Sequence, residues 1–377
     1  MNVCMRCLYY LSIVDVSERN GQGVYALETL KALLRLGERP TFVCPRPKRP
    51  DELDRLRDEY GFQVAYLSPK RRARSALWHL LVQFQLFYRL LSAPRPMVLL
   101  YSLKPSMVAP LIYAKMSGAS VYLQVEGLIP ATVRTVMGPW LAAIGRRIVR
   151  WNLRAARKVY PAYAAASEWV SSEIQEQSRI QIQPCGVDFQ LFSIGAARRP
   201  TSSLTIGYVG SFRPNHLLRQ LLQATADLDV VLRLAGDGAE REPLEEMRRK
   251  EGRERVHFSG TIDRSGVPSY YAGCDVVWAA TSPNHWGIPI KAYEGLAMNK
   301  KVIVTRRSEF RFIEERGYGF TIERGTEDEI RELITRLIKM NRHGDLYDNV
   351  DSREHIRLEH SWDRMAETIV HAMAHDR

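Results

Sequence analysis

The sequence predicts an α/β protein of two doubly wound domains, each with a parallel sheet, that face a central cleft. Short β-branched or apolar runs alternate with segments of helical periodicity along most of the chain, a pattern typical of parallel sheets covered by helices. The alternation forms two blocks, and residues 181–203, which include PCGVD and GAARRPTSS, interrupt it. A length of 377 residues fits two domains.

The expected elements follow in chain order. A first strand lies within the opening residues, and further strands span Pro40–Cys44, Gln63–Leu67, Met97–Tyr101, Ser120–Val125, Leu204–Val209, Val230–Ala235, Val256–Ser259, Val276–Ala279 and Lys301–Val304. Helical periodicity covers Val24–Leu36, Arg74–Ser92, Trp140–Lys158, Leu217–Leu228, Ala239–Lys250 and Ile290–Ala297.

Composition excludes several classes of protein. Apolar residues make up 45% and charged residues 25% of the chain, which excludes a disordered tail, a collagen-like fibre and a coiled coil. No uncharged apolar run reaches the roughly 18 residues that a transmembrane helix needs. The opening residues, MNVCMRCLYYLSIVDVSE, lack the basic start and the cleavage site of a signal peptide, so we expect a cytoplasmic protein.

Five cysteines over this length do not make a disulfide framework. Cys4 and Cys7 form a C-x-x-C pair, but no second ligand pair at zinc-finger spacing accompanies it. We therefore interpret this pair as part of a buried strand and expect no metal site.

The excess positive charge lies in the first half of the chain. Residues 1–190 hold 26 Lys and Arg against 14 Asp and Glu, which accounts for the whole net charge of +12. The helix Arg74–Ser92 follows a KRRAR cluster and is apolar nearly all round. The helix Trp140–Lys158 has no acidic residue, an apolar row (Leu141, Ile144, Ile148 and Trp151) and a basic row (Arg147, Arg150, Arg154, Arg157 and Lys158).

Two interpretations of these helices stay open. They either cover the first sheet and expose a solvated basic face, or dock on an anionic membrane surface. No nucleic-acid-binding module accompanies the charge, so we expect no nucleic-acid partner.

Four segments suit phosphate binding because glycines and polar side chains follow expected strands, where open α/β sheets bind their ligands. They are the turn NGQG at 20–23, GSFRPNH at 210–216, AGDG at 235–238 and NHWGIPIKAYE at 284–294. In the last segment, Lys291 and Glu294 share one helix face. Singly, each segment also fits an ordinary turn or a surface ion pair.

The order and wording of these segments resemble retaining glycosyltransferases of family 4, which have the GT-B fold. The resemblance rests on GQGVYALETLKALLRLGERPTFVC, QPCGVDFQLF, IGYVGSFRPNHLLRQLLQA, LRLAGDGAERE, VHFSGTIDRSGVPSYYAGCDVVW, IPIKAYEGLAMNKKVIVT and the closing SWDRMAETIV. It implies an acceptor-binding, membrane-facing domain of residues 1–182 with the C-terminal helix 361–377. Residues 183–360 would bind the nucleotide-sugar donor.

The resemblance also implies roles for residues. Glu294 would bind the ribose hydroxyls, backbone groups of Gly260, Thr261 and Ile262 the base, and Arg213, His216 and Arg219 the leaving diphosphate. Glu126 would orient an acceptor hydroxyl, although a salt-bridged loop carboxylate fits it equally. With Glu126, His216 and Arg213 as the catalytic set, the remaining donor residues would be Gly21, Gln22, Gly23, Ser211, His285, Trp286, Gly287, Ile288 and Lys291.

Besides Cys185, which replaces the usual Asn in the QPCGVDFQLF segment, three positions depart from the family pattern. Trp286 replaces the first glutamate of the E-x7-E motif, Ser211 the usual arginine and His216 the usual lysine. A neutral histidine carries less charge than lysine. Either nearby arginines and Lys291 compensate, or activity is altered or lost.

The expected function is therefore retaining, metal-independent hexosyl transfer from a nucleotide sugar, with UDP favoured and GDP or ADP possible, and no cofactor. A lipid-linked or amphiphilic acceptor at the inner face of the cell membrane would fit surface polysaccharide or glycolipid synthesis. Alternatives are a soluble transferase acting on a small molecule, a nucleotide-sugar 2-epimerase and a non-catalytic nucleotide-sugar-binding scaffold.

Overall fold

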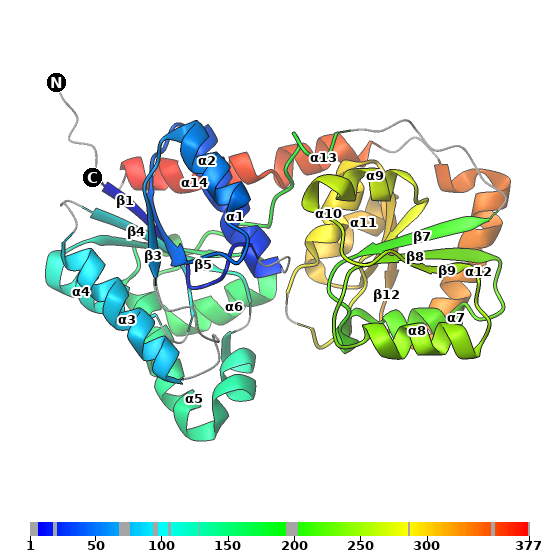
Figure 1. Cartoon of the computed structure of the whole chain (residues 1–377), viewed down its shortest axis with the longest axis horizontal. Coiled ribbons are helices and arrows are strands. Elements are labelled where there is room, and N and C mark those ends of the chain that lie inside the picture. The colour runs from blue at the N-terminus through cyan, green and yellow to red at the C-terminus, as the bar shows by residue number, and fades with distance from the viewer. Residues whose placement is uncertain are drawn as a thin grey trace. The chain divides into compact units, whose positions relative to one another are not determined.

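The computed structural model describes residues 7–17, 21–67, 76–92, 97–104, 107–127, 129–193, 203–285, 287–347 and 351–375, with the side chains at 76–79, 97 and 129–141 left out of the description. The chain forms two compact units (Figure 1). The first comprises Met1–Cys185, Trp286–Ile288 and Trp362–Arg377, and the second Gly186–His285 and Pro289–Ser361.

The first unit is built on a six-stranded parallel sheet with the strand order β3-β2-β1-β4-β5-β6. Its strands are β1 (Cys7–Leu11), β2 (Thr41–Pro45), β3 (Val64–Leu67), β4 (Met97–Ser102), β5 (Ser120–Val125) and β6 (Lys158–Pro161). The strand order reverses between β1 and β4, and ligands of doubly wound folds bind at such a reversal.

The helices of the first unit are α1 (Gly21–Arg35), α2 (Asp51–Tyr60), α3 (Ala76–Leu91), α4 (Ala109–Ser117), α5 (Ile129–Ala155), α6 (Ala164–Glu173) and the C-terminal α14 (Trp362–His375). Helix α14 packs on α1. The ring of Trp362 meets that of Tyr25 edge-on at 5.2 Å between centroids, and Arg35 pairs with Asp363 at 2.6 Å. These contacts fix the end of the chain to the unit in which it begins.

The second unit repeats this topology with the order β12-β11-β10-β7-β8-β9, again all parallel. Its strands are β7 (Leu204–Val209), β8 (Val230–Ala235), β9 (Val256–Phe258), β10 (Val276–Trp278), β11 (Lys301–Thr305) and β12 (Gly319–Ile322). Its helices are α7 (Leu218–Ala224), α8 (Arg241–Lys250), α9 (Val267–Ala272), α10 (Ile290–Ala297), α11 (Arg311–Glu315), α12 (Glu327–His343) and α13 (Ser352–Glu359). The reversal here falls between β7 and β10.

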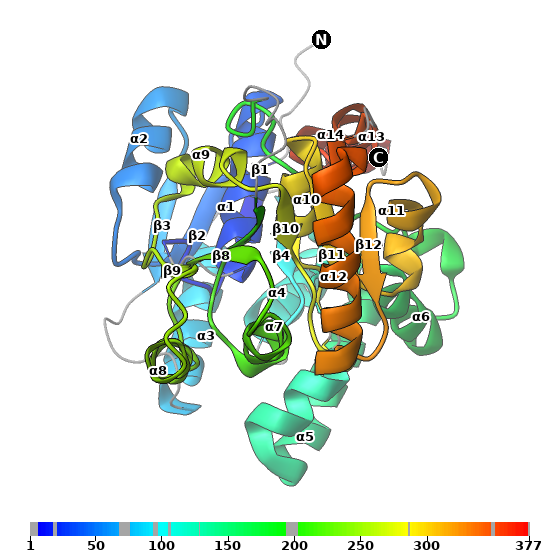
Figure 2. The same cartoon turned by 90° about the vertical axis from the view of Figure 1, so that its right-hand side faces the viewer.

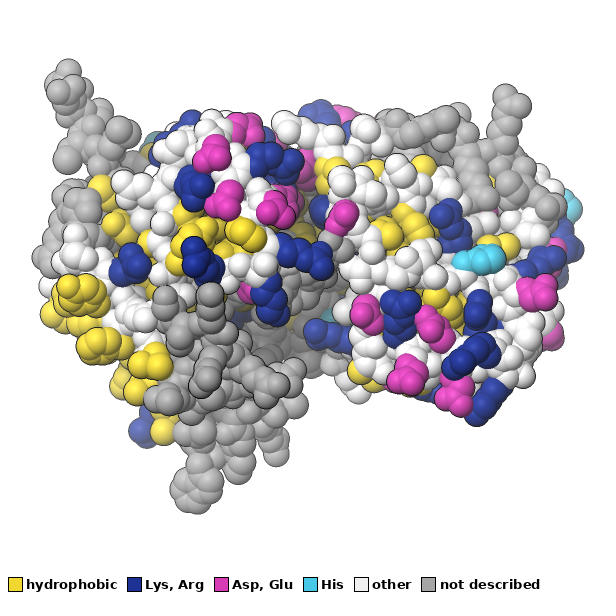
Figure 3. All heavy atoms as spheres, viewed as in Figure 1, with side chains coloured by type: hydrophobic (Ala, Val, Ile, Leu, Met, Phe, Trp, Pro, Cys, Tyr) yellow, Lys and Arg dark blue, Asp and Glu magenta, His cyan; other side chains and the backbone are white. Residues whose placement is uncertain are grey.

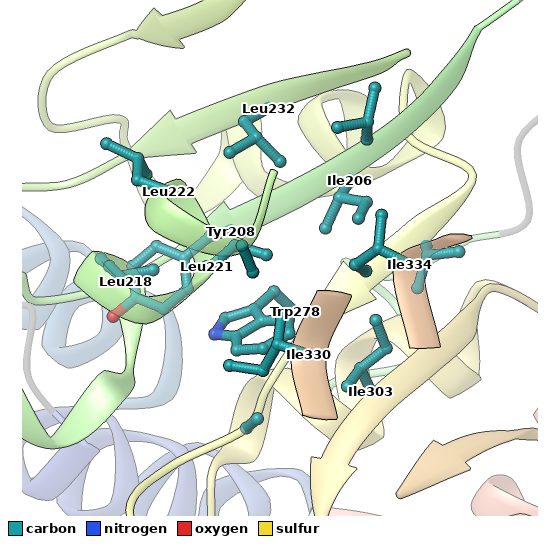
Figure 4. Close-up of a cluster of buried hydrophobic side chains, with 14 of the residues drawn as sticks. Ile206, Tyr208, Leu218, Leu221, Leu222, Leu232, Trp278, Ile303, Ile330 and Ile334 are labelled. Atoms are coloured by element: carbon teal, nitrogen blue, oxygen red, sulfur yellow. The ribbon is translucent and has the colours of Figure 1, made fainter. Parts of the chain in front are cut away.

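Helices cover both faces of the second sheet (Figure 2). Trp278 of β10 joins a buried cluster with residues of α7 and α12, including Leu221 and Ile334 (Figure 4). The neighbouring Val277 lies on the opposite face, under Gly295 of α10. Burial on both faces explains why these strands read as continuous apolar runs.

The structure confirms the expected fold class, and the differences lie at individual elements. The sequence prediction missed β6 and β12, although it found strands that are just as short, such as β3 and β10. It also began a helix at Trp140, whereas α5 begins at Ile129 and runs through Gly138 and Pro139. Local glycine–proline signals favour a break, and the helix continues through them.

The apolar row predicted for α5 is not its buried row. Ile144 and Trp151 are 56% and 51% exposed, whereas Val149 and Leu153 are buried. Among the described residues, no helix combines the length and apolar character needed to cross a membrane.

Candidate functional site

The strand-order reversal of the second unit brings together three segments predicted to bind phosphate. The segment 210–216 follows β7, and the segment that leads to α10 follows β10. The two are joined directly, because the N–H of Ser282 donates to the carbonyl of Asn215 at 2.8 Å and the indole of Trp278 to that of His216 at 3.0 Å. The third segment, 235–238, follows β8, which pairs with β7.

Glycines allow the loops after β7, β8 and β9 to touch. The N–H of Gly210 donates to the carbonyl of Ala235 at 3.0 Å, and that of Gly236 to the carbonyl of Gly260 at 2.7 Å. A Cβ on Gly236 would lie 1.8 Å from the carbonyl oxygen of Gly210, and one on Gly238 2.4 Å from that of Phe212. The glycines of the AGDG segment are therefore required because the backbones of neighbouring loops approach them closely, and not only because the chain turns there.

Lys291 is a half-buried cation at the centre of this region. It lies in the first turn of α10, and its Nζ is 4.0 Å from the ring centroid of Tyr208. A Cβ on Gly210 would come within 3.0 Å of this Nζ, so the amine lies directly beside the strand-end glycine. Burial lowers the pKa of Lys291 to about 7, although Glu294 acts to raise it.

His216 is held in a neutral form. Its Nδ1 lies 2.6 Å from the carbonyl oxygen of Ser211 and 2.6 Å from the hydroxyl of Tyr208. The carbonyl only accepts, so this contact assigns a proton to Nδ1 and leaves Nε2 as the lone-pair nitrogen. Burial, with the charge of Lys291, lowers the pKa of His216 to about 2.

His285 lies beside His216, with ring centroids 6.0 Å apart. The amide nitrogen of Asn215 lies 2.7 Å from its Nδ1, and Arg307 donates to its carbonyl. Burial, followed by the charge of Arg307, lowers the pKa of His285 to about 4. Arg213, which is exposed, acts in the same direction on both histidines. The positive charge here therefore comes from Arg213, Lys291 and Arg307, and not from the imidazoles.

Glu294 lies one turn after Lys291 and is almost fully buried. Its Oε1 is 2.5 Å from Nη1 of Arg264, and the two side chains are 5% and 24% exposed. The Arg264 guanidinium also stacks over the ring of Phe192 at 4.9 Å. The carboxylate that the resemblance assigns to the ribose is thus already ion-paired, with an arginine from the loop between β9 and α9.

The same loop holds Gly260, Thr261 and Ile262, which are predicted to bind the base. Through its ion pair, Arg264 connects this loop to Glu294, the residue predicted to bind the ribose. The guanidinium of Arg219 pairs with Glu240 at 3.2 Å, and its contact with the diphosphate stays a prediction. We therefore place Arg213 and Lys291 ahead of Arg219 as charges available to a diphosphate.

The first unit carries a second polar cluster at the ends of its neighbouring strands β4 and β5. Glu126, just past β5, accepts a hydrogen bond from Ser102 at the end of β4. Its other oxygen lies 3.6 Å from Nζ of Lys104. Glu126 is thus a salt-bridged loop carboxylate, as one of the two interpretations has it, and its contact with an acceptor stays a prediction. The predicted Gly21, Gln22 and Gly23 open α1, which follows β1 at this edge of the sheet.

Some of the predicted residues lie outside the part of the chain that the structure describes, or are placed only by the elements that flank them. Trp286, Cys4 and the basic cluster at 70–74 lie outside the described residues. Gly287 and Ile288 are half-buried and lie between β10 and α10. Cys7, Cys44, Cys185 and Cys274 are free thiols. In the described part of the chain, no cluster of three or more potential ligands could hold a metal ion.

Sequence reasoning missed Arg264, Arg307 and Lys104. Each is a cation within a few residues of the end of a strand, and that placement is the signal that could have found it. Tyr208 was missed because it reads as a core strand residue, although its hydroxyl organises the contacts of His216.

Comparison with known proteins locates a family within the second unit. Residues 203–340 match the family model described as glycosyl transferases group 1. A curated relative, an uncharacterised glycosyltransferase of Methanocaldococcus jannaschii, is 28% identical over 132 residues, which cover 35% of this chain and 37% of the relative. The match therefore spans little more than a third of either protein.

Solved structures extend the likeness to the whole chain. Sucrose-phosphate synthase from Thermosynechococcus elongatus superposes with a TM-score of 0.79 at 18% identity, covering 98% of each chain. Anabaena HepE in complex with UDP and glucose gives a TM-score of 0.76 at 13% identity, covering 98% of this chain and 100% of that one. These neighbours are GT-B glycosyltransferases, and at such identities the likeness shows the fold, which confirms the GT-B prediction.

Proposed function

We propose that the protein is a nucleotide-sugar-dependent glycosyltransferase whose second unit binds the donor. The observation that carries this proposal is the arrangement at the β7–β10 reversal, where the glycine-lined strand ends adjoin Lys291 and Arg213, inside a glycosyl transferase group 1 segment. Backbone N–H groups and fixed cations stabilise charge on a departing diphosphate.

In the proposed reaction, the bond between the anomeric carbon and the diphosphate oxygen breaks, and the oxygen of an acceptor hydroxyl forms the new bond to that carbon. The proton of that hydroxyl passes to the departing diphosphate. Lys291 and Arg213 would stabilise the charge that develops on the diphosphate. Glu294 would accept hydrogen bonds from the ribose. With these cations at the diphosphate, the chemistry needs no metal ion, and retention of configuration follows the family resemblance.

The finer assignments belong to the same proposal. HepE was solved with UDP and glucose, which supports a UDP-sugar ahead of GDP- or ADP-sugars. The basic first unit supports a lipid-linked or amphiphilic acceptor at an anionic, cytoplasmic membrane surface, in surface polysaccharide or glycolipid synthesis. Another structural neighbour is a lipopolysaccharide outer core galactosyltransferase, with a TM-score of 0.67 at 13% identity.

A non-catalytic sugar-nucleotide scaffold is the second candidate. It is favoured by the neutral state of His216, which weakens the charge available to the leaving group. The scaffold would bind the donor without turning it over.

Thermal denaturation with UDP, GDP, ADP and their sugar conjugates tests the proposal. A ligand that binds the native state raises Tm. At a hundred times its Kd, such a ligand increases the free energy of unfolding by about 2.7 kcal/mol. We expect the largest shift with a UDP-sugar. A Tm shift without any hydrolysis of the donor or transfer of its radiolabelled sugar would favour the scaffold. No Tm shift with any nucleotide would exclude a donor site.

Donor affinity should fall as pH rises through 7. An anionic diphosphate binds the charged form of Lys291, whose pKa is lowered to about 7, so binding takes up a proton. UDP-glucose carries a fully ionised diphosphate throughout this range, and its affinity should drop up to about tenfold between pH 6.5 and 8. Calorimetry should show this slope in the wild type and a flat profile in Lys291→Arg, because arginine stays charged. Equal slopes in both proteins would exclude Lys291 as the titrating group.

A further inference from the structure

Exposed apolar side chains gather on three helices of the first unit. Helix α4 contacts both α3 and α5, and hydrophobic side chains collect over α3 and α4 at the left of Figure 3. Of the twelve large hydrophobic residues exposed among those described, nine lie on these helices, and we call them the α3–α5 surface: Leu80, Leu81, Phe84, Tyr88, Leu91, Ile112, Met116, Ile144 and Trp151. Contiguous patches of this kind mark interaction sites.

The outer side of α3 is not needed to hold this helix in place. Val82, Leu86 and Leu90 form its buried side, and Gln83 accepts hydrogen bonds from the backbone at the start of α4, at 3.0 Å from both Val108 and Ala109.

Three further apolar residues of α3 lie on its outer side. Leu80 and Tyr88 are 69% exposed and Phe84 is 73% exposed, and their spacing of four puts them on one face. This helix therefore has an apolar stripe that the fold itself does not use.

The charge around the α3–α5 surface selects an anionic occupant. Residues 60–167 hold fifteen Lys and Arg residues but one acidic residue, Glu126. Arg89, Lys115, Arg146, Arg147 and Arg154 are exposed on the same three helices. A second copy of the chain would bring one such basic surface against another, which like charges oppose. An anionic lipid surface accepts both the apolar and the basic side chains.

Trp151 and Tyr88 suit the boundary between headgroups and acyl chains. Both are exposed rings with one polar atom, the type of side chain enriched at membrane interfaces. Nζ of Lys115 lies 5.7 Å from the ring centroid of Trp151, so a cation accompanies the ring, as a lysine that reaches toward headgroups would.

We propose that the α3–α5 surface inserts its apolar side chains into the interfacial region of an anionic bilayer, while the basic side chains around it contact the lipid headgroups. This inference rests on the proposed function in that it locates where the enzyme would meet a lipid-borne acceptor. It differs from adsorption by charge alone, because part of the binding then survives high salt.

Vesicle sedimentation with purified full-length protein tests the inference. The vesicles are phosphatidylcholine with and without phosphatidylglycerol. The double variant Leu80→Ser, Phe84→Ser should bind anionic vesicles at least about tenfold more weakly than the wild type, since it loses two apolar side chains that insertion buries. The matched control, Leu36→Ser with Leu358→Ser, removes two exposed leucines outside the surface, which are 37% and 45% exposed, and should bind as the wild type does.

Salt separates insertion from adsorption. At about 1 M salt, where the screening length is about 3 Å, the wild type should retain measurable binding and the Leu80/Phe84 variant should lose it. Complete release of the wild type by salt, or equal binding by variant and wild type, would overturn the inference. A dimer in light scattering that only this variant abolishes would assign the surface to a second copy and would overturn it too.

Nucleotide binding keeps the two proposals apart. The Leu80/Phe84 variant should keep the same thermal shift with UDP-glucose as the wild type. Wild-type protein that binds vesicles but no nucleotide would support the surface and remove the donor site. The reverse result would overturn the surface alone.

Discussion

Gly236→Ala is expected to destabilise the second unit by more than about 4 kcal/mol, in the range of the most damaging single substitutions. The new Cβ would lie 1.8 Å from the carbonyl oxygen of Gly210, and the φ of 143° at this position is one that alanine rarely adopts. Neither backbone can withdraw freely, because Gly210 and Gly236 are both hydrogen-bonded to neighbouring strand ends. Thermal denaturation should show Tm lower by about 10 °C or more.

Gly266→Ala is the matched control. A Cβ there meets nothing within 4 Å, and its φ of −84° is open to any residue. Its Tm should stay within about 2 °C of the wild type, in keeping with surface substitutions. If Gly236→Ala had the same Tm as this control, the close approach of the loops after β7 and β8 would be wrong.

Glu294→Ala should weaken UDP-sugar binding by about a hundredfold or more, because a carboxylate that accepts two ribose hydroxyls contributes about 3 kcal/mol or more. The structure adds a second effect. Removal of the carboxylate leaves the mostly buried Arg264 without its 2.5 Å partner, and breaking a buried pair costs about 3–5 kcal/mol. This variant should therefore lose both affinity and stability.

Two companion variants separate these effects. Glu294→Ala combined with Arg264→Met removes the guanidinium together with the carboxylate, and should recover stability without recovering affinity. Glu314→Ala removes a carboxylate that pairs with Arg306 at 3.3 Å on the surface, and should change neither. Calorimetry and thermal denaturation give the two readouts. Undiminished affinity in the double variant would take Glu294 out of the donor site.

Much of the second unit could be predicted from the sequence because its signals are local. Strands β7 and β8 begin and end at the expected residues, since buried parallel strands are short apolar runs that end at glycine. The prediction was weaker where the signal was short or mixed. The helix predicted over Trp140–Lys158 ran into the first residue of β6, and that strand was missed, whereas β3 and β10, which are no longer, were predicted.

The first unit shows the limit of periodicity more clearly. The sequence of α5 contains two apolar rows, and a helical pattern by itself does not say which row faces the sheet. The structure buries Val149 and Leu153 and exposes Ile144 and Trp151. The same ambiguity hid the outer stripe of α3, whose apolar residues go nearly all round the helix.

The sequence by itself determined the α/β architecture, the glycine-bearing strand ends and the basic character of the first half, because the signal for each lies in residues that are close together in the chain. The tertiary structure alone decided which charges meet. Arg264 pairs with Glu294, and Arg219 pairs with Glu240. Burial and the charge of Lys291 keep His216 neutral. Such pairings depend on distances and desolvation between segments far apart in the chain, and these are set only once the sheets and helices have packed.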